Sequence, residues 1–423
     1  MDAIQPSWSV AGKVAFRFFV VYFILFVLPF PFSYIPGLDF LWGYYGSAWQ
    51  VIVPWIGKHV LALSYEVVIT PPGNGSGDTT FRFVQVFAIA LISLVACFIW
   101  SILDWRRKNY DQASYWTMIG MRYYLGTWMM GYGFQKIFML QFHLSDARLL
   151  QTYGDSSPMG LLWTFMGYSY SYNLFTGGGE VLGGLLLLFR KGVTAGSLLI
   201  IAIMSNVVVL NFAYHVPVKL FSMHLLAIAI VLASVDGRRL FDFLRNRPVE
   251  SRREKLYLSE GWWGNARLAA TFLFAAWMFF GRIAYGIQYE KEMSRSKPML
   301  KGKYQVKEFY FNGSRDANPG DTIAWKSFRI DYAGFARAIL LNDHAVDFTL
   351  DVDTARRTFQ LRTPFDRYSL NYRQSDNGDL VLWGPRLERD SVHVTLERID
   401  NRPKDFILTS HQFQWINEYP DNR

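Results

Sequence analysis

Seven long runs of apolar residues occupy most of this chain up to about residue 290, and the remaining third contains none. Each run is close to the ~20 residues that an α-helix needs to cross a hydrocarbon core of ~30 Å. The runs cover residues 14–33, 82–104, 115–140, 161–189, 193–214, 217–236 and 266–286. Hydrophobic residues make up 51% of the chain, which is high for a water-soluble protein. The sequence therefore predicts a multi-pass α-helical membrane protein with about seven transmembrane helices.

Lys and Arg gather in short segments between the apolar runs, and these segments predict the orientation of the chain. With seven crossings they all fall on one side, and basic loops remain in the cytoplasm. The segments contain Lys13 and Arg17, Arg106 to Lys108, Arg190 and Lys191, and the basic residues from Arg238 to Lys255. We therefore expect a cytoplasmic N-terminus, an uncleaved first helix and an external C-terminal domain. The net charge of +9 is then explained by these basic loops and not by binding to nucleic acid. Membrane lipids are the expected partners.

Familiar enzyme signatures are missing from the sequence. Cys97 is the single cysteine, which excludes an intramolecular disulfide, a CxxC redox pair and a multi-thiolate metal site. No Gly-rich phosphate loop, nucleophile elbow or HExxH motif occurs. The catalytic residues, if there are any, are therefore unknown from the sequence.

Residues 34–81 link the first two runs and are rich in Trp and Tyr before a Pro- and Gly-rich loop. Trp and Tyr favour the membrane boundary, so we expect interfacial helices followed by a loop. Asp78 or Thr79 is expected to cap the second spanning helix. The alternative is that residues 74–80 fold back over a cavity and offer polar ligands.

From about Leu300 the pattern changes to short segments of period-two alternation separated by turn signals such as Asn312-Gly313. Eight such segments predict an antiparallel up-and-down β-barrel, lipocalin-like in outline. They are Tyr304–Phe311, Ile323–Asp331, Phe335–Asn342, Val346–Val352, Thr358–Arg362, Tyr368–Arg373, Leu380–Trp383 and Val392–Ile399. The interior is either filled by side chains or holds an apolar ligand. The aromatic tail from Phe406 to Arg423 is expected to pack on the barrel or the membrane face.

Polar side chains inside the apolar runs are costly, at ~2.5 kcal/mol or more for a charged group, so each needs a partner or a use. Because successive helices alternate in direction, the polar groups of the third to sixth runs should meet near the outer face and form a pocket open to the outside. The candidates for ligand binding or proton relay are Gln135, Lys136, Glu180, Asn206, Asn211, His215, Lys219 and His224.

Glu180 is the strongest candidate, since it is a lone carboxylate among glycines that permit close helix approach. Its expected counter-ion is Lys136 or Lys219, and the pair serves either helix register or a substrate, proton or quinone. Asn211 and His215 are four residues apart and should share a helical face, either as a relay or as a helix-end hydrogen bond.

Other polar residues support weaker hypotheses. A metal site built from His143, His215 and His224 has weak support, because the three residues come from three segments and only Glu180 offers a fourth ligand, so no metal is predicted. Arg122 and Arg282 lie near helix ends and are expected to extend their side chains toward the lipid headgroups.

Residues 114–240 resemble the DoxX-like family of four-helix membrane proteins. The resemblance rests on the segment Arg122 to Lys136, on Ser157-Pro-Met-Gly, on Gly177-Gly-Gly-Glu180 to Arg190, and on Asn206–Lys219. It implies a bacterial inner membrane location and respiratory partners, because a related subunit accompanies a thiosulfate:quinone oxidoreductase. The cofactor is unknown from the sequence, and a quinone is the one candidate.

The expected organisation has four parts. Residues 1–113 carry two helices and the external aromatic segment, 114–240 the DoxX-like core, 241–295 a basic cytoplasmic loop and the seventh helix, and 296–423 a periplasmic β domain. The expected function is a membrane subunit of a quinone-linked redox or stress-response system. The alternative is a non-enzymatic assembly, cargo or lipid-binding protein that recruits membrane or periplasmic proteins through the β domain. A small-solute transporter is least favoured, because no inverted repeat is visible.

Overall fold

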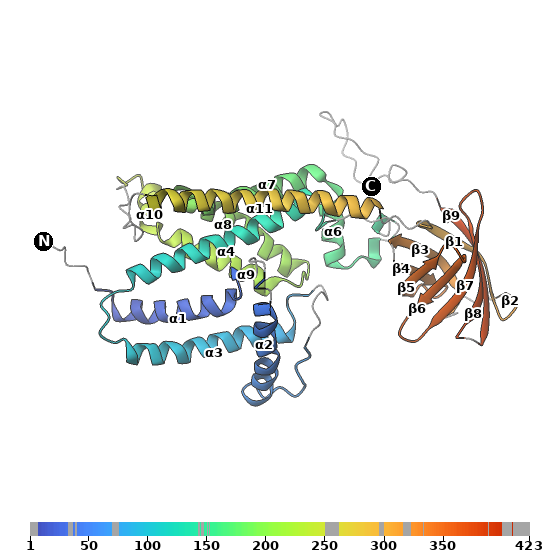
Figure 1. The fold of residues 1–423 in the computed structure, drawn as a ribbon, viewed down its shortest axis with the longest axis horizontal. Coiled ribbons are helices and arrows are strands. Elements are labelled where there is room, and N and C mark those ends of the chain that lie inside the picture. Colours follow the sequence, from blue (N-terminus) through green and yellow to red (C-terminus); the bar gives the residue numbers. More distant parts are fainter. Residues whose placement is uncertain are drawn as a thin grey trace. The chain divides into compact units, whose positions relative to one another are not determined.

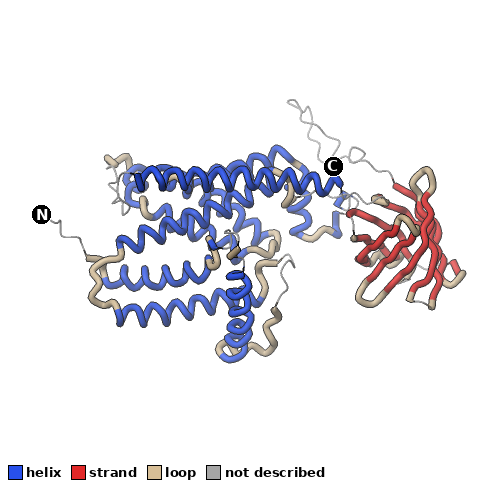
Figure 2. The backbone as a smooth tube through the Cα atoms, viewed as in Figure 1, coloured by secondary structure: helices blue, strands red, loops and turns tan. Residues whose placement is uncertain are grey.

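A helical unit and a β-barrel unit make up the chain, as Figures 1 and 2 show. The computed structural model divides them as Met1–Gly286 and Ile287–Arg423. It describes residues 7–32, 37–38, 40–69, 76–142, 144, 148–149, 151, 153–249, 262–295, 300–315, 323–332, 334–387, 389–399 and 408.

Helices form within all seven predicted apolar runs. They are α1 (Val10–Val27), α2 (Phe40–His59), α3 (Thr80–Leu103), α4 (Asp111–Ile137), α6 (Pro158–Tyr168), α7 (Tyr170–Leu188), α8 (Val193–Ala213), α9 (Lys219–Ser234), α10 (Gly237–Leu244) and α11 (Trp262–Arg295). Among the described residues, α1, α3, α8 and α11 are long and apolar enough to cross a membrane. The pair α9 and α10, bent by 73°, would make a fifth span. Several long apolar helices therefore suggest a membrane protein, and the count of seven crossings stays a prediction.

The run 161–189 is not one helix, in contrast to our expectation. Ser169 adopts an extended backbone conformation between α6 and α7, and its side chain accepts a hydrogen bond from the Tyr172 amide. The Asn173 side-chain amide donates to the carbonyl oxygens of Met166 and Ser169. These bonds satisfy backbone groups that a continuous helix would satisfy internally, so the chain turns at Ser169.

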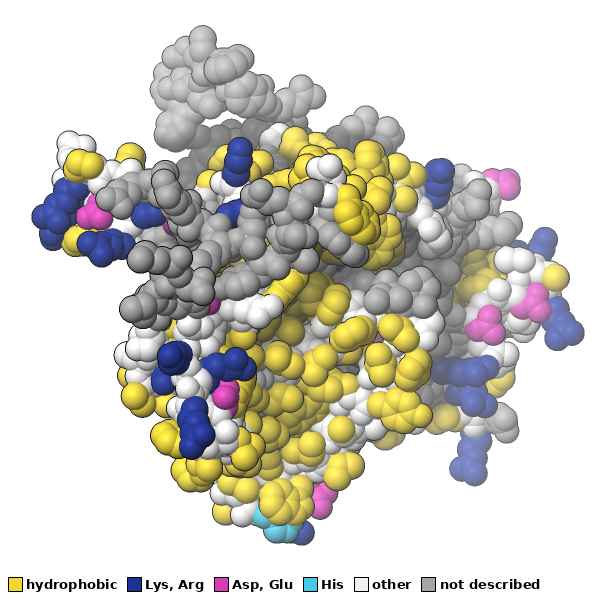
Figure 3. Space-filling view, turned by 60° about the vertical axis from the view of Figure 1, so that its left-hand side comes forward, with side chains coloured by type: hydrophobic (Ala, Val, Ile, Leu, Met, Phe, Trp, Pro, Cys, Tyr) yellow, Lys and Arg dark blue, Asp and Glu magenta, His cyan; other side chains and the backbone are white. Residues whose placement is uncertain are grey.

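The helical unit exposes an extensive apolar surface. Figure 3 shows hydrophobic side chains over much of its described surface, with Lys and Arg gathered in separate groups. On α3, Leu94, Phe98 and Leu103 are 58%, 67% and 79% exposed. Water-soluble monomers rarely expose apolar patches of this extent, whereas lipid-facing helices do. The surface therefore agrees with the hydropathy of the sequence.

Close contacts between glycines join α4 to α7. Gly133 of α4 meets Gly177 of α7, where a Cβ added to either residue would lie 2.5 or 2.6 Å from the carbonyl oxygen of the other. Gly126 and Gly184 meet in the same way seven residues along each helix, at 3.0 and 2.8 Å. The two helices run antiparallel, and only glycine permits this backbone approach.

Helix α2 runs across the direction of α3 (Figure 2). Its buried residues Trp49, Val53 and Ile56 pack with Val84 and Ala88 of α3. An interfacial helix would cross a membrane-spanning helix in this way. The aromatic stretch thus forms a helix, as expected.

The C-terminal unit is a closed eight-stranded antiparallel barrel, and all eight predicted strands are confirmed. The strands are β1 (Gly302–Phe311), β3 (Trp325–Tyr332), β4 (Phe335–Leu340), β5 (Ala345–Asp353), β6 (Thr358–Arg362), β7 (Arg367–Gln374), β8 (Leu380–Arg386) and β9 (Asp390–Ile399), with β2 (Ser314–Arg315) pairing onto β1. Consecutive strands pair, and β1 closes on β9. The tail from Phe406 to Arg423, except for Leu408, lies outside the described residues, so its predicted packing stays a prediction.

Buried side chains fill the barrel interior. Trp325, Phe328 and Phe359 are at most 2% exposed and belong to one continuous core cluster. Trp325 stacks on Phe328 with ring centroids 5.0 Å apart. Of the two interiors that the sequence allowed, the filled one is observed.

Tyr368 makes the stability of the barrel depend on pH. Burial, together with the neighbouring Asp366 carboxylate, raises the pKa of Tyr368 above its ordinary value of 10.0. Below pH 10 both the folded and unfolded chains keep this proton; as the pH rises further, only the unfolded chain releases it. We therefore expect the free energy of unfolding to fall above pH 10, by at most ~1.4 kcal/mol per pH unit from this group. Urea unfolding followed by near-UV circular dichroism at pH 8 and pH 11 measures the slope.

The matched control uses two Tyr→Phe substitutions. Tyr368→Phe should reduce the slope, whereas Tyr310→Phe, at a half-buried position on the outer surface, should leave it unchanged. Equal slopes for Tyr368→Phe and the wild type would contradict this assignment.

Candidate functional site

Lys136 of α4 and Glu180 of α7 form an ion pair inside the helical unit. The Lys136 Nζ donates to both carboxylate oxygens of Glu180, each at 2.7 Å. The two residues are 6% and 2% exposed. The predicted counter-ion of Glu180 is thus confirmed as Lys136, with Lys219 engaged elsewhere.

The pair lies beside the closest contact between α4 and α7. Gly133 is three residues before Lys136 and Gly177 three residues before Glu180, so each charge lies about one helical turn from the glycine contact. The Tyr132 and Phe142 rings lie about 6 Å from Nζ, at 5.9 and 6.0 Å. Glycine contact brings the helix axes together, and the ion pair joins the same two helices about one turn away.

Asn211 belongs to a second, separate contact. Its side-chain amide donates to the Ser222 hydroxyl at 3.0 Å, which joins α8 to α9. The prediction that Asn211 and His215 share a helical face is wrong, because α8 ends at Ala213 and His215 adopts a left-handed backbone with φ of 55°. His215 and Asn206 are both exposed, so neither joins the buried contacts.

Lys219 takes part in a third contact, with the loop before α3. The Asp78 carboxylate accepts hydrogen bonds from the backbone amides of Lys219 and Leu220 at 2.8 and 3.0 Å, and the Lys219 Nζ lies 3.5 Å from it. Asp78 therefore caps α9 across 141 residues of sequence, while Thr79 caps α3. The capping hypothesis for this loop is confirmed, but Asp78 caps a different helix from the one expected.

Removing this cap tests its contribution. Asp78→Ala is expected to lower the free energy of unfolding by about 1–2 kcal/mol, because two amides at the start of α9 lose their acceptor. Asp78→Asn keeps an acceptor oxygen and should lose less. Denaturant unfolding in detergent micelles gives both values, with Glu66→Ala as the control at an exposed acid before the same loop. A loss for Asp78→Ala no larger than for Glu66→Ala would contradict the cap.

His224 forms the fourth contact, with α1. Its Nε2 is 2.6 Å from the Tyr22 hydroxyl and its Nδ1 is 2.7 Å from the Leu220 carbonyl oxygen. Because a carbonyl can only accept, Nδ1 carries a proton, and in the neutral imidazole the phenol donates to Nε2. The imidazole also stacks on Phe26 with ring centroids 4.1 Å apart.

Three further residues with a predicted role lie near these contacts. Arg122 does not extend to the headgroups but donates to the carbonyl oxygens of Leu187 and Leu188, at 2.9 and 3.1 Å, at the C-terminus of α7. Gln135 is half-buried, and its backbone carbonyl accepts from the amides of Leu140 and Gln141. Arg282 lies against Gly131 of α4, where a Cβ added to the glycine would be 3.4 Å from Nη2.

Of the eight polar residues expected in one pocket, five divide among the four contacts, and the side chains of Gln135, Asn206 and His215 belong to none of them. Within the described residues no group of three His, Cys, Asp or Glu side chains could hold a metal, and His143 lies outside them. The arrangement can hold helices in register, and the Tyr22–His224 bond can carry a proton. Sequence reasoning missed Tyr22, because an aromatic residue in an apolar helix is too common to indicate a site. It also missed the partner of Asp78, although the acidic side chain of Asp78 was a signal that a partner exists.

Similarity to known proteins is limited to part of the chain. A segment of 122 residues, or 29% of the chain, is 30% identical to the uncharacterized protein YwoB of Bacillus subtilis (strain 168) and covers 78% of it. No family model matches, and no solved structure matches. Through this segment the chain belongs to the same family as YwoB.

Proposed function

We propose that this chain is a non-enzymatic assembly protein of the bacterial inner membrane, which recruits a partner protein through its β-barrel. The helical unit is the anchor, DoxX-like in residues 114–240, with the N-terminus in the cytoplasm and the barrel in the periplasm. The buried Lys136–Glu180 pair and the filled barrel suit structural roles, since neither offers a reactive group to a soluble substrate.

One feature of the barrel surface carries the proposal. Tyr310, His393 and Trp383 lie opposite one another on the adjacent strands β1, β9 and β8. They line a surface hollow of about 520 Å³, and Trp383 is 39% exposed. Trp and Tyr side chains are enriched among the residues that contribute most to binding at protein interfaces. The natural partner is therefore a periplasmic or membrane protein with an apolar side chain that fits the hollow.

A photo-crosslinking amino acid at position 383 tests the proposal in living cells. We expect one discrete crosslinked protein from position 383 and none from position 349, where Thr349 is exposed on β5. His393→Ala should weaken the crosslink at position 383 and leave the barrel folded. Identical crosslinking at both positions, or none at 383, would contradict the proposal.

The second candidate function is a membrane subunit of a quinone-linked redox or stress-response system. The observation that favours it is the Tyr22–His224 hydrogen bond, because reduction of a quinone to a quinol takes two electrons, here from a redox partner protein, and two protons, and this pair can pass a proton. Extraction of the purified protein should then yield a stoichiometric isoprenoid quinone, and Tyr22→Phe should reduce quinone turnover without loss of the bound quinone. Protein that contains no extractable quinone would count against this candidate.

A further inference from the structure

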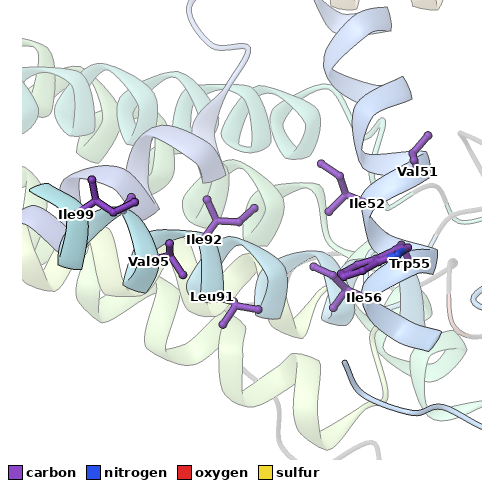
Figure 4. Close-up of a pocket in the computed structure, with 9 residues that line it drawn as sticks. Val51, Ile52, Trp55, Ile56, Leu91, Ile92, Val95 and Ile99 are labelled. Carbon is purple, nitrogen blue, oxygen red and sulfur yellow. The ribbon is translucent and has the colours of Figure 1, made fainter. Parts of the chain in front are cut away.

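An apolar groove opens where α2 crosses α3. Figure 4 shows its lining, with Val51, Ile52 and Trp55 on α2 and with Leu91, Val95 and Ile99 at intervals of four residues along α3. The groove has a volume of about 600 Å³. Every side chain that lines it is apolar, and Val51, Trp55 and Val95 are 72%, 57% and 54% exposed. The groove is thus open to whatever surrounds the helices.

The direction of the groove follows α3. The row from Leu91 to Ile99 extends for about 12 Å at the helical rise of ~1.5 Å per residue. Helix α3 is long and apolar enough to cross a membrane, and α2 runs across it. A ligand in the groove therefore has one end at α2 and extends along α3 into the membrane.

A basic group lies at the α2 end of the groove. His59 is four residues after Trp55, and the two rings stack with centroids 5.1 Å apart. The His59 Nδ1 is 2.9 Å from the Trp55 carbonyl oxygen, to which it donates, and Nε2 takes no part in this hydrogen bond. Lys58 is exposed next to it. One face of α2 therefore changes from apolar to basic along its length, from Ile52 and Trp55 to His59.

We propose that this groove binds one anionic phospholipid, with an acyl chain along Leu91, Val95 and Ile99 and the headgroup phosphate against Lys58 and His59. The uniformly apolar lining suits a hydrocarbon chain, and the basic end complements a negative headgroup. Trp55 lies at the junction, where Trp is favoured at the membrane boundary. The proposal depends on the membrane location of the helices and not on the partner of the barrel.

Native mass spectrometry of the purified full-length chain tests this site, with phosphatidylglycerol and phosphatidylcholine as separate probes at equal concentration. We expect about fivefold tighter binding of phosphatidylglycerol, from about one basic side chain near the headgroup. The double variant Lys58→Gln/His59→Gln should bind both lipids equally. Ala96→Phe places a ring in the groove and should reduce binding of both lipids at least fivefold.

Leu94→Phe is the matched control, because Leu94 is 58% exposed on α3 and does not line the groove. It should bind both lipids as the wild type does. If Ala96→Phe loses its helical circular dichroism, Val95→Asn replaces it as the groove variant. Equal binding of the two lipids by the wild type would overturn the proposal, as would equal effects of the groove variant and Leu94→Phe.

Discussion

Glu180→Gln is expected to lower the free energy of unfolding of the helical unit by about 3–5 kcal/mol, because the substitution leaves the Lys136 ammonium buried without a counter-charge. The lysine Nζ has both carboxylate oxygens at 2.7 Å, and neither residue is more than 6% exposed. Water cannot replace the lost carboxylate as it would at the surface. Denaturant unfolding in detergent micelles, followed by helical circular dichroism, measures the loss.

A double variant distinguishes a structural role of the Lys136–Glu180 pair from a chemical one. Lys136→Met/Glu180→Leu removes both charges and fills the space with apolar atoms, and it should recover most of the stability that either single variant loses. The control is Glu397→Gln in the barrel, where the pair with Lys307 is about half exposed, at 50% and 53%. This change should cost less than about 1 kcal/mol. A double variant as unstable as the sum of the single variants would contradict a structural role.

Gly177→Ala should destabilise the same unit by about 1–3 kcal/mol or more, although alanine is the better helix former. A Cβ at residue 177 would lie 2.6 Å from the Gly133 carbonyl oxygen and 3.0 Å from the Lys136 Cβ. Backbone atoms cannot move aside as a flexible side chain can, so α4 and α7 must separate. The separation should also lengthen the neighbouring ion pair. Unfolding in micelles gives the magnitude.

The adjacent glycine is a matched control for this substitution. Gly178 is in the same helix, and a Cβ there would meet nothing within 4 Å. Gly178→Ala should therefore raise stability by up to ~1 kcal/mol through helix propensity. Opposite signs at neighbouring positions are the expected result. A stabilising Gly177→Ala would show that the helices do not approach as closely as the structure indicates.

Local patterns in the sequence were sufficient for much of the fold. Period-two alternation is a property of each strand alone, so all eight barrel strands were predictable. The ion pair was predictable because Lys136 and Glu180 are isolated charges in apolar runs, where an unpaired charge is costly. The glycines around Glu180 likewise indicated close packing, and Gly177, Gly183 and Gly184 do contact neighbouring helices.

Long-range and irregular features were not predictable. Alternating helix direction placed the polar groups at a common depth but did not say which helix faces meet, so Asn211, Lys219 and His224 were assigned to one pocket instead of three contacts. The bond from Asp78 to α9 joins residues 141 positions apart, and no local pattern records it. Helix α8 ends at Ala213, before His215, so His215 does not lie on the same helical face as Asn211. An error of one turn in a predicted helix end is enough to change which side chains share a face.

Site-directed cysteine labelling tests the membrane topology, which is the central claim of this account. In a Cys97→Ser background, Thr349→Cys places an exposed thiol on the barrel and Lys108→Cys places one in the segment after α3. An odd number of crossings with a cytoplasmic N-terminus predicts that a membrane-impermeant maleimide labels residue 349 in intact cells whose outer membrane has been made permeable. Residue 108 should be labelled only after the inner membrane is disrupted. Labelling of residue 108 in intact cells, or protection of residue 349, would contradict the account.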